Sequence, residues 1–265
     1  MLNMNTLTSN KHRSKLKICV PKCPTYHIAT VSGHCKIQKQ LNNQNMKNYT
    51  VDLEKKWDYE NGFYLTCETS RIGKLLNHLE IYNKIINLPG DILEFGVYKG
   101  TSMVRLLSFR NLLETETSRK VIGFDVFGKF PDELALDSDK KFVERFENAG
   151  GYGISKEEFT LHLDNKGFKN YDLIEGDIIK TIPEYLKKNP SFKISLLHID
   201  VDVYEPTKVI LENLWDRIVK GGILMLDDYG TVEGETKAVD EFFAGQNIEI
   251  NKPRFNYIPS YIIKP

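Results

Sequence analysis

The 265-residue sequence predicts an α/β fold built on a central, mostly parallel sheet with helices on both faces. Short apolar runs rich in Ile and Leu alternate with segments of helical periodicity, which is the pattern of parallel strands joined by crossover helices. A glycine-containing turn follows the first run at 96–100, and acidic clusters close two later runs at 198–204 and 227–230. Because ligands bind at the carboxyl ends of parallel strands, these three segments predict where the site lies.

Five short apolar runs bounded by turn residues are the predicted parallel strands. They are 91–96, 120–125, 171–177, 194–197 and 222–226. An amphipathic helix at 68–87 precedes them and ends at Pro89-Gly90, and a second helix runs from the glycine turn to Leu113. Two terminal runs, 248–250 and 257–263, predict an antiparallel hairpin at the edge of the sheet.

The later helices are predicted from their end signals. Ser155 begins a capping-box pattern, and Gly167 ends the helix that follows it. Pro206 suits the first turn of the next helix, and the pair Gly221-Gly222 predicts its end. The segment 127–152 is long, polar and glycine-containing, so we expect it to form a mobile cover over the site.

Charge is distributed unevenly along the chain. The formal net charge is zero, but residues 1–50 hold eight Lys or Arg and no acidic residue, so the remainder holds 36 − 8 = 28 basic against 36 acidic side chains. Residues 51–265 are therefore acidic overall, which disfavours nucleic-acid binding because that needs a basic surface. No apolar run in the sequence is long enough to span a membrane. We therefore expect a basic, disordered extension at 1–50 and one catalytic domain at 51–265.

Cysteine usage predicts a cytoplasmic protein. Four cysteines are too few for a disulfide framework in a chain of this length. Zinc binding by the extension is an alternative, because thiolate and imidazole suit that ion. The residues concerned, Cys19, Cys23, His27, His34 and Cys35, match no common zinc spacing, so we favour a plain extension.

Three successive strand ends predict an adenosine-type cofactor. The pattern Glu94-x-Gly96-x-x-x-Gly100 lets the backbone approach a ligand at a helix N-terminus. Asp125 ends the next strand, where a carboxylate can accept from ribose hydroxyls, and Asp177 ends the third, near an adenine amine. The glycine spacing differs from that of dinucleotide folds, and an acid suits a cationic cofactor, so S-adenosylmethionine is favoured over NAD. The candidate cofactor-binding residues are Glu94, Gly96, Gly100, Thr101, Ser102, Asp125 and Asp177.

Four aspartates at two adjacent strand ends predict a metal site. Asp200, Asp202, Asp227 and Asp228 would repel one another without a cation or proton between them. Hard oxygen ligands select Mg²⁺, or Mn²⁺ or Ca²⁺, over zinc. A cation lowers the pKa of a coordinated hydroxyl, so one acid could bind the ion while another takes the proton. Asp200 and Asp202 would share a side if the strand continued.

Four segments of the chain resemble the macrocin O-methyltransferase family. They read DILEFGVYKGTS at 91–102, GFDVFGKFP at 123–131, HIDVDVYEPT at 198–207 and GGILMLDDYG at 221–230. The resemblance implies a class I methyltransferase fold, which is Rossmann-like, S-adenosylmethionine as methyl donor, a magnesium ion and a sugar hydroxyl as acceptor. It also implies that Asp200, Asp227 and Asp228 bind the metal and that Asp202 is the general base. His198 stands where the family more often has Arg.

The acceptor is predicted only by class. We expect a nucleotide-linked sugar or a glycan precursor, with contacts from His198, Tyr204 and Tyr229, and a homodimer is plausible for this fold class. One alternative is a metal-dependent O-methyltransferase of a catechol-like phenol, whose acidity reduces the need for a base. Another is a non-catalytic module that binds the nucleoside or the ion, which the presence of all four acids disfavours.

Overall fold

The computed structural model describes residues 51–132 and 134–265. The expected extension and the zinc site considered as its alternative both fall on residues 1–50 and therefore lie outside the described residues. No helix of the described part is long and apolar enough to cross a membrane.

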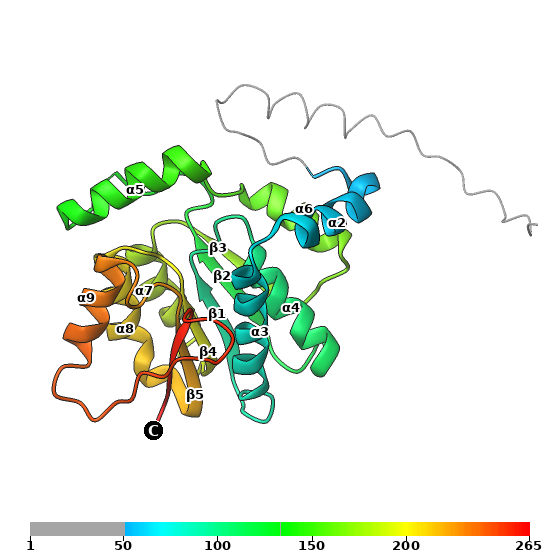
Figure 1. Ribbon diagram of the computed structural model, residues 1–265. Coiled ribbons are helices and arrows are strands. Elements are labelled where there is room, and N and C mark those ends of the chain that lie inside the picture. Colours follow the sequence, from blue (N-terminus) through cyan, green and yellow to red (C-terminus); the bar gives the residue numbers. More distant parts are fainter. Residues whose placement is uncertain (1–50, 133) are drawn as a thin grey trace, which may run out of the picture. The chain divides into compact units, whose positions relative to one another are not determined.

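A six-stranded sheet in the order β3-β2-β1-β4-β5-β6 forms the centre of the fold (Figure 1). Its first five strands are parallel, and β6 pairs antiparallel with β5. The strands are β1 Asp91–Phe95, β2 Val121–Asp125, β3 Tyr171–Glu175, β4 Ile194–Ile199, β5 Ile218–Leu226 and β6 Ser260–Ile263. The chain leaves β1 toward β2 and β3 and then returns to β4, so the order reverses between β1 and β4. Ligands of open α/β sheets bind at such a reversal, beyond the carboxyl ends of the strands.

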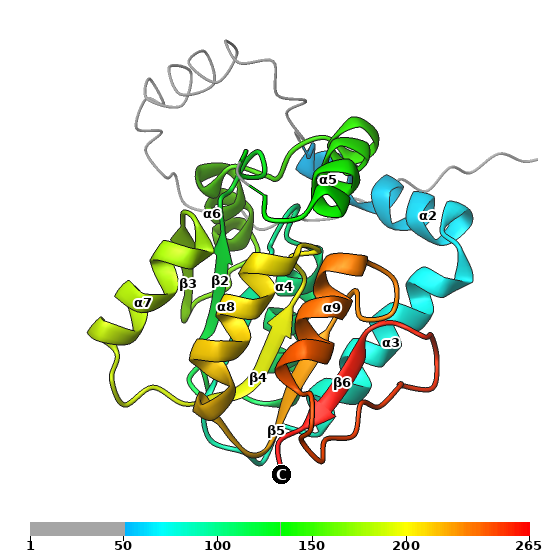
Figure 2. The same cartoon turned by 90° about the vertical axis from the view of Figure 1, so that its left-hand side faces the viewer.

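Two helical layers cover the two faces of the sheet, and each encloses an apolar core. One core is built with α3 Thr69–Asn83, α4 Thr101–Leu113 and α6 Lys156–Asn165. The other is built with α7 Ile178–Lys188, α8 Tyr204–Leu214 and α9 Glu233–Phe242. Figure 2 shows α8 and α9 in front of the sheet, with α3 and α4 on its other side. The predicted α/β class with helices on both faces is confirmed.

Most predicted elements are present, and their end signals act as expected. The hydroxyl of Ser155 accepts a hydrogen bond from Glu158 N at the start of α6 (3.2 Å). Gly167 follows the helix with a φ of +72°, the left-handed conformation that glycine adopts without strain. Pro206 lies in the first turn of α8. The start of α6, its end and the start of α8 therefore follow from local sequence.

Two boundary predictions are wrong. Helix α8 ends at Leu214 and continues as the short 3₁₀ helix η3 Trp215–Arg217, while Gly221-Gly222 lie inside β5. A Cβ on Gly222 would lie 2.7 Å from a side-chain atom of Ile218 and 3.1 Å from Ser195 O, so this glycine serves close packing rather than a helix stop. The run 248–250 forms no strand; only Asn251 bridges to Tyr261 there, and the antiparallel pair at the edge is β5 with β6.

Several helices, α7 and α9 among them, occupy segments for which no helix bounds were predicted. The 3₁₀ helix η2 Leu53–Lys55 and the helix α2 Lys56–Thr66 precede α3, and neither contains a buried residue. Helix α5 Asp137–Gly150 lies within the segment 127–152 that was expected to be a mobile cover. Figure 1 shows α5 beyond the carboxyl ends of the strands, so the segment has the position of a cover.

Candidate active site

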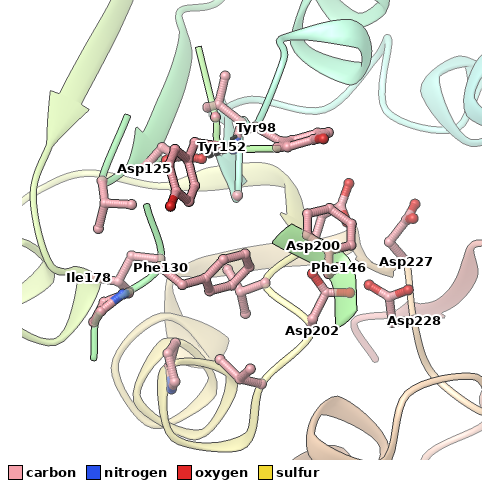
Figure 3. A pocket seen from close by; sticks show the side chains of 18 of the residues that line it. Tyr98, Asp125, Phe130, Phe146, Tyr152, Ile178, Asp200, Asp202, Asp227 and Asp228 are labelled. Carbon is pink, nitrogen blue, oxygen red and sulfur yellow. Dashed lines mark hydrogen bonds between the residues drawn. The ribbon is translucent and has the colours of Figure 1, made fainter. Parts of the chain in front are cut away.

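A cavity of about 890 Å³ opens at the carboxyl ends of the parallel strands. Figure 3 shows Asp200, Asp202, Asp227 and Asp228 together on one side of it, with Asp125 and Ile178 on the other. The site therefore has an acidic end beyond β4 and β5 and a second end beyond β1, β2 and β3. The sequence-predicted acids are all brought together at the first end.

Backbone hydrogen bonds that extend the sheet hold Asp200 and Asp227 in place. Asp200 N donates to Phe95 O (2.9 Å), and Asp227 N donates to Ile199 O (2.9 Å), so both acids stand one residue beyond their strands. Gly96 makes this spacing possible, because a Cβ there would lie 1.7 Å from Asp200 O. Its φ of +90° also favours glycine.

Asp202 lies in a turn rather than in a strand. Strand β4 ends at Ile199, and Asp202 has a φ of +64°, a left-handed conformation that Asp tolerates better than most residues. Strand alternation is therefore not what brings Asp202 beside Asp200. Burial, followed by the negative charge of Asp200, raises the pKa of Asp202 to about 7, although a hydrogen bond with Asp228 lowers it.

Asp228 pairs with Asp202 and with the start of α9. Burial and the charge of Asp202 raise the pKa of Asp228 well above its ordinary value. Asp228 N donates to the carboxylate of Glu235 (3.0 Å), a fully buried acid of α9. Burial raises the pKa of Glu235 as well. If all carboxyl groups of the acidic end were ionised, the cationic side chains nearby could not neutralise them.

Asp227 is the most enclosed of the four aspartates and faces helix α3. Lys74 Nζ donates to Asp227 Oδ2 and forms a buried ion pair with it. His198 Nε2 lies 3.5 Å from Asp227 Oδ1, and His78 Nε2 lies 3.9 Å from the same atom. Although burial raises the pKa of Asp227, the neighbouring His198 and Lys74 lower it below its ordinary value. Asp227 is therefore an ionised carboxylate inside the protein.

The cationic partner of Asp227 was not predicted from the sequence. Burial lowers the pKa of Lys74, but Asp227 and Asp200 raise it above its ordinary value, so Lys74 stays protonated. Arg71 and Arg105 also line the cavity, from α3 and α4. A signal for Lys74 exists in the sequence: Lys74, Asn77 and His78 recur at helical spacing on the buried face of α3. Polar residues on a buried face indicate a polar partner across the interface.

Asn77 attaches α3 to a C-terminal loop. Its side chain donates to Asn256 O (2.9 Å) and Ile258 O (2.7 Å), and it accepts from Phe255 N (3.0 Å). Ile258 itself lines the cavity. The loop thus fixes the face of α3 that presents Lys74 to Asp227.

The glycine turn and Asp125 form the second end of the cavity. The carboxylate of Asp125 accepts hydrogen bonds from Val97 N (2.6 Å), Tyr98 N (2.8 Å) and Phe127 N (2.7 Å). It therefore shapes the turn between β1 and α4 as well as lining the cavity. Gly96, Thr101, Ser102 and Asp177 also line the cavity.

Two predicted cofactor residues lie behind the lining. Glu94 is fully buried and accepts a hydrogen bond from Ser102 Oγ (2.5 Å). Burial raises its pKa to about 8, although the Ser102 hydrogen bond lowers it. Gly100 caps α4 with a φ of +78°, and a Cβ there would lie 2.1 Å from the ring of Phe159. Both support the turn from beneath rather than facing the cavity.

Asp177 has a structural contact in addition to its place in the lining. Its side chain caps α7 by accepting from Ile179 N (3.0 Å), and it forms an ion pair with Lys180 (3.2 Å). One carboxylate oxygen caps the helix while the other faces Lys180, so Asp177 combines a cap with its place at the second end of the cavity.

The three residues predicted to contact an acceptor lie outside the cavity lining. His198 is a fully buried residue of β4, and its ring meets that of His78 in α3. Tyr204 donates its hydroxyl proton to Glu241 (2.5 Å), and Tyr229 donates to Asp240 (2.8 Å). The tyrosines are close to the acids in sequence, but their hydroxyls are directed to α9.

The cover brings aromatic side chains over the cavity. Phe130, Phe146 and Tyr152 line it together with Tyr98 (Figure 3). Tyr98 donates its hydroxyl proton to Gly150 O (2.7 Å) at the end of α5. These rings were not predicted as site residues, because nothing in their local sequence distinguishes them from core aromatics.

A buried carboxylate joins the cover to the acidic end. Asp139 of α5 accepts from Tyr204 N (3.0 Å) at the start of α8. It is 2% exposed, and a Cβ on Gly234 of α9 would lie 2.4 Å from its Oδ1. The cover therefore rests directly on the turn that carries Asp202.

Relatives of this chain are named O-methyltransferases. Demethyldecarbamoylnovobiocin O-methyltransferase of Streptomyces niveus is 30% identical over 166 residues, which are 60% of this chain and 60% of that protein. A tetracenomycin-rhamnosyl 4'-O-methyltransferase of Streptomyces olivaceus is 29% identical over 152 residues, or 54% of each chain. The matched stretches thus span little more than half the length of these relatives.

Solved structures share the fold. The O-methyltransferase NovP superposes with a TM-score of 0.61 at 26% identity, covering 73% of this chain and 80% of that chain. CalS11, a TDP-rhamnose 3'-O-methyltransferase of calicheamicin biosynthesis, gives a TM-score of 0.58 at 25% identity, covering 86% and 91%.

The family model for macrocin O-methyltransferase (TylF) matches residues 22–261. The match begins inside the segment 1–50, which was expected to be an extension. It includes every described element up to β6, together with all four aspartates of the acidic end. With the fold, the glycine turn and the strand-end acids in place, this chain belongs to the macrocin O-methyltransferase family.

Proposed function

We propose that the protein transfers a methyl group from S-adenosylmethionine to a sugar hydroxyl, assisted by a divalent metal ion and an aspartate base. The observation that carries the proposal is the set of four aspartates gathered at one end of a cavity whose other end is a glycine turn. Relatives named for novobiocin, rhamnosyl-tetracenomycin and TDP-rhamnose methylation support a sugar acceptor. A nucleotide-linked sugar or a glycan precursor is the class we favour.

The acidic end fits a divalent cation. Asp227 Oδ1 and Asp228 Oδ2 are buried and have no hydrogen-bond partner among the described residues. Leaving a buried polar atom unsatisfied costs about 1–3 kcal/mol, and a hard cation would satisfy such oxygens. Asp200 and Asp227, with Asp228 beside them, would hold the ion. When bound there, it lowers the pKa of a coordinated hydroxyl.

Asp202 is suited to accept the proton of the acceptor hydroxyl. It lines the cavity beside the acids that would hold the ion, and its pKa of about 7 lies near neutral pH, where a general base works best. In the reaction, the bond from the hydroxyl oxygen to the methyl carbon forms as the sulfur–methyl bond breaks. The hydroxyl proton passes to Asp202, and the sulfonium becomes a neutral thioether.

The second end of the cavity suits the methyl donor. Gly96 of the glycine turn and Thr101 and Ser102 of the first turn of α4 line this end of the cavity. Asp125 and Asp177 lie there too, at the ends of β2 and β3. The backbone can approach a ligand at the glycine turn, since no side chain intervenes. In this arrangement, the donor would lie across β1 to β3 and the acceptor hydroxyl beside β4 and β5.

A labelled-methyl assay tests the proposal. Purified protein is incubated with labelled S-adenosylmethionine, Mg²⁺ or Mn²⁺ and a panel of nucleotide sugars and catechols, with and without chelator. We expect transfer to a sugar that chelator abolishes. Transfer to catechols alone would overturn the sugar assignment, and transfer that is unaffected by chelator would overturn the metal assignment.

Asp202→Asn tests the base. We expect turnover to fall roughly 10²–10⁴-fold, the usual contribution of a general base, while calorimetry shows unchanged binding of S-adenosylhomocysteine. Asp240→Asn is the matched control, because Asp240 accepts from Tyr229 away from the cavity. Full activity in Asp202→Asn would refute the role.

A further inference from the structure

Two arginines line the cavity without a partner in the described part of the protein. Five cationic side chains line it, and each of Lys74, Lys99 and Lys180 forms a hydrogen bond or an ion pair with another residue. The side chains of Arg71 and Arg105 form neither with any residue in 51–132 or 134–265. A guanidinium group holds its N–H donors in a fixed plane that matches the oxygens of a carboxylate or a phosphate. The two arginines therefore have donors available for a ligand.

The two guanidinium groups lie close enough to affect one another. Arg71 belongs to α3 and Arg105 to α4, and these helices pack side by side (Figure 1). Burial, followed by the positive charge of Arg71, lowers the pKa of Arg105. Two positive charges that face one cavity repel each other, and a bound anion would remove that repulsion. Together with the missing partners, this indicates that the ligand brings the negative charge.

Both arginines stand in the N-terminal part of a helix, which also favours an anion. Arg71 lies in the first turn of α3, and that turn contains no acidic residue. A cation at this position opposes the helix dipole, so helix stability does not explain it. Arg105 follows Thr101 by four residues, so the two share a face of α4, and Thr101 lines the cavity. An oxyanion held between the helices would be stabilised by both guanidinium groups and by both dipoles.

The arginines lie toward the acidic end of the cavity, where the acceptor is proposed to bind. The acids that raise the pKa of Arg105 are Asp227, Glu94 and Asp200, and the first and third of these belong to the acidic end. Arg71 is exposed as well as lining the cavity, so it stands where a ligand enters. The nucleoside of the donor is proposed to lie at the other end, beyond β2 and β3. The position of the arginines therefore favours the acceptor as the source of the anion.

We propose that Arg71 and Arg105 bind an oxyanion carried by the acceptor, either a phosphate of a nucleotide-linked sugar or the carboxylate of an acidic sugar. The inference rests on the proposed function, because it assumes a sugar acceptor beside the acidic end. It narrows the acceptor to anionic sugars and makes neutral glycosides poor substrates. The two arginines also counter the repulsion that the acidic end exerts on an anionic acceptor.

Two other roles for the arginines make different predictions. They could bind the carboxylate of S-adenosylmethionine, in which case their loss weakens binding of the donor and not of the acceptor. They could also act only as distant counter-charges to the acidic end, in which case their loss affects anionic and neutral acceptors alike. The decisive comparison is therefore between matched acceptors that differ only in the anionic group.

The test uses the full-length protein, Mg²⁺, labelled S-adenosylmethionine and two matched pairs of acceptors. One pair is a nucleoside-diphosphate deoxyhexose and the methyl glycoside of the same sugar. The other is the methyl glycoside of a uronic acid and that of the corresponding neutral hexose. In the wild type, we expect the anionic member of at least one pair to have the higher kcat/KM by at least about tenfold, the value of one charge-assisted hydrogen bond. The pair that shows the preference identifies the anion as phosphate or carboxylate.

Arg71→Gln and Arg105→Gln test whether the arginines cause this preference. Each should raise KM for the anionic acceptor at least about tenfold, while KM for the neutral acceptor and calorimetric binding of S-adenosylhomocysteine stay unchanged. Arg217→Gln is the matched control, because Arg217 lies in η3, directly before β5 and thus at the opposite edge of the sheet from the cavity. In the wild type, sulfate should inhibit competitively with the anionic acceptor and not with S-adenosylmethionine.

The outcomes separate this inference from the function on which it rests. Equal kcat/KM within both pairs in the wild type would overturn the anion subsite and leave sugar methylation standing, and so would a preference that survives in both variants. Weaker binding of S-adenosylhomocysteine in either variant, or sulfate that competes with the donor, would assign the arginines to the donor and overturn the proposal. An equal rise in KM for anionic and neutral acceptors would also overturn it. If no sugar accepts a methyl group, the sugar assignment of the proposed function fails and this inference fails with it.

Discussion

Gly96→Ala should destabilise the protein more than its backbone conformation alone explains. The φ of +90° costs an L-residue about 1–2 kcal/mol, as any positive φ of this kind does. The added Cβ would also lie 1.7 Å from Asp200 O. That oxygen belongs to a backbone segment held by the hydrogen bond from Asp200 N to Phe95 O, so it cannot simply rotate away. Overpacking of this kind typically costs a further 1–3 kcal/mol, which brings the total to roughly 2–5 kcal/mol.

Urea unfolding followed by circular dichroism measures the effect, with Gly167→Ala as the matched control. Gly167 has a φ of +72°, and a Cβ there meets nothing within 4 Å. The control therefore carries the conformational cost without the overlap, and we expect it to lose only about 1–2 kcal/mol. The two variants should differ in midpoint at a constant m-value, since the surface exposed on unfolding is the same.

Equal loss of stability in the two alanine variants would refute this reasoning. It would mean that Asp200 O moves aside at negligible cost, so that the glycine does not set the spacing between β1 and β4. A larger loss accompanied by a changed m-value would indicate altered compactness of one state rather than the local overlap.

Three further predictions concern stability. Ser155→Ala should cost about 1 kcal/mol in urea unfolding, because Glu158 N loses its cap; no loss would show that the cap is dispensable. Glu94 has a pKa of about 8 in the folded protein against 4.5 ordinarily, so native stability falls as pH rises between these values, by up to about 5 kcal/mol. Glu94→Gln removes this pH-dependent loss. In urea unfolding with chelator present, the stability of the variant should therefore rise relative to that of the wild type between pH 4.5 and 8. A stability difference that stays constant over this range would contradict the assignment. Arg119→Met should cost about 3–5 kcal/mol, because it leaves the buried Glu114 without its ion pair, whereas Arg254→Met, on the surface, should change stability by less than about 0.5 kcal/mol.

The parallel sheet could be predicted because each strand is a short apolar run, and its end is marked by turn residues or acids. The glycines illustrate the limit of such local signals. Gly167 ends a helix as predicted, but Gly222 stands in β5, where it lets the chain pass close to Ser195 O. The same residue type serves both purposes, and only tertiary packing distinguishes them.

The acids of the site could be predicted for a similar reason. Once β4 and β5 are neighbours, Asp200 and Asp227 must stand side by side, whatever surrounds them. Lys74 could not be paired with Asp227 in this way, because 153 residues separate them and the pairing depends on how α3 packs on the sheet. Nearness in sequence was equally uninformative for Tyr204 and Tyr229, whose hydroxyls find acids on α9 instead.

The attachment of Asn77 to residues 255–258 bears on how the protein matures during synthesis. Its three hydrogen bonds join segments 178 to 181 residues apart. Helix α3 leaves the ribosome early, yet its polar face stays without these partners until nearly two hundred more residues have been translated. Contacts of such long range form late and slowly. A nascent chain stalled before this loop would therefore have most of its sheet, but the α3 side of the cavity's acidic end would be unfinished.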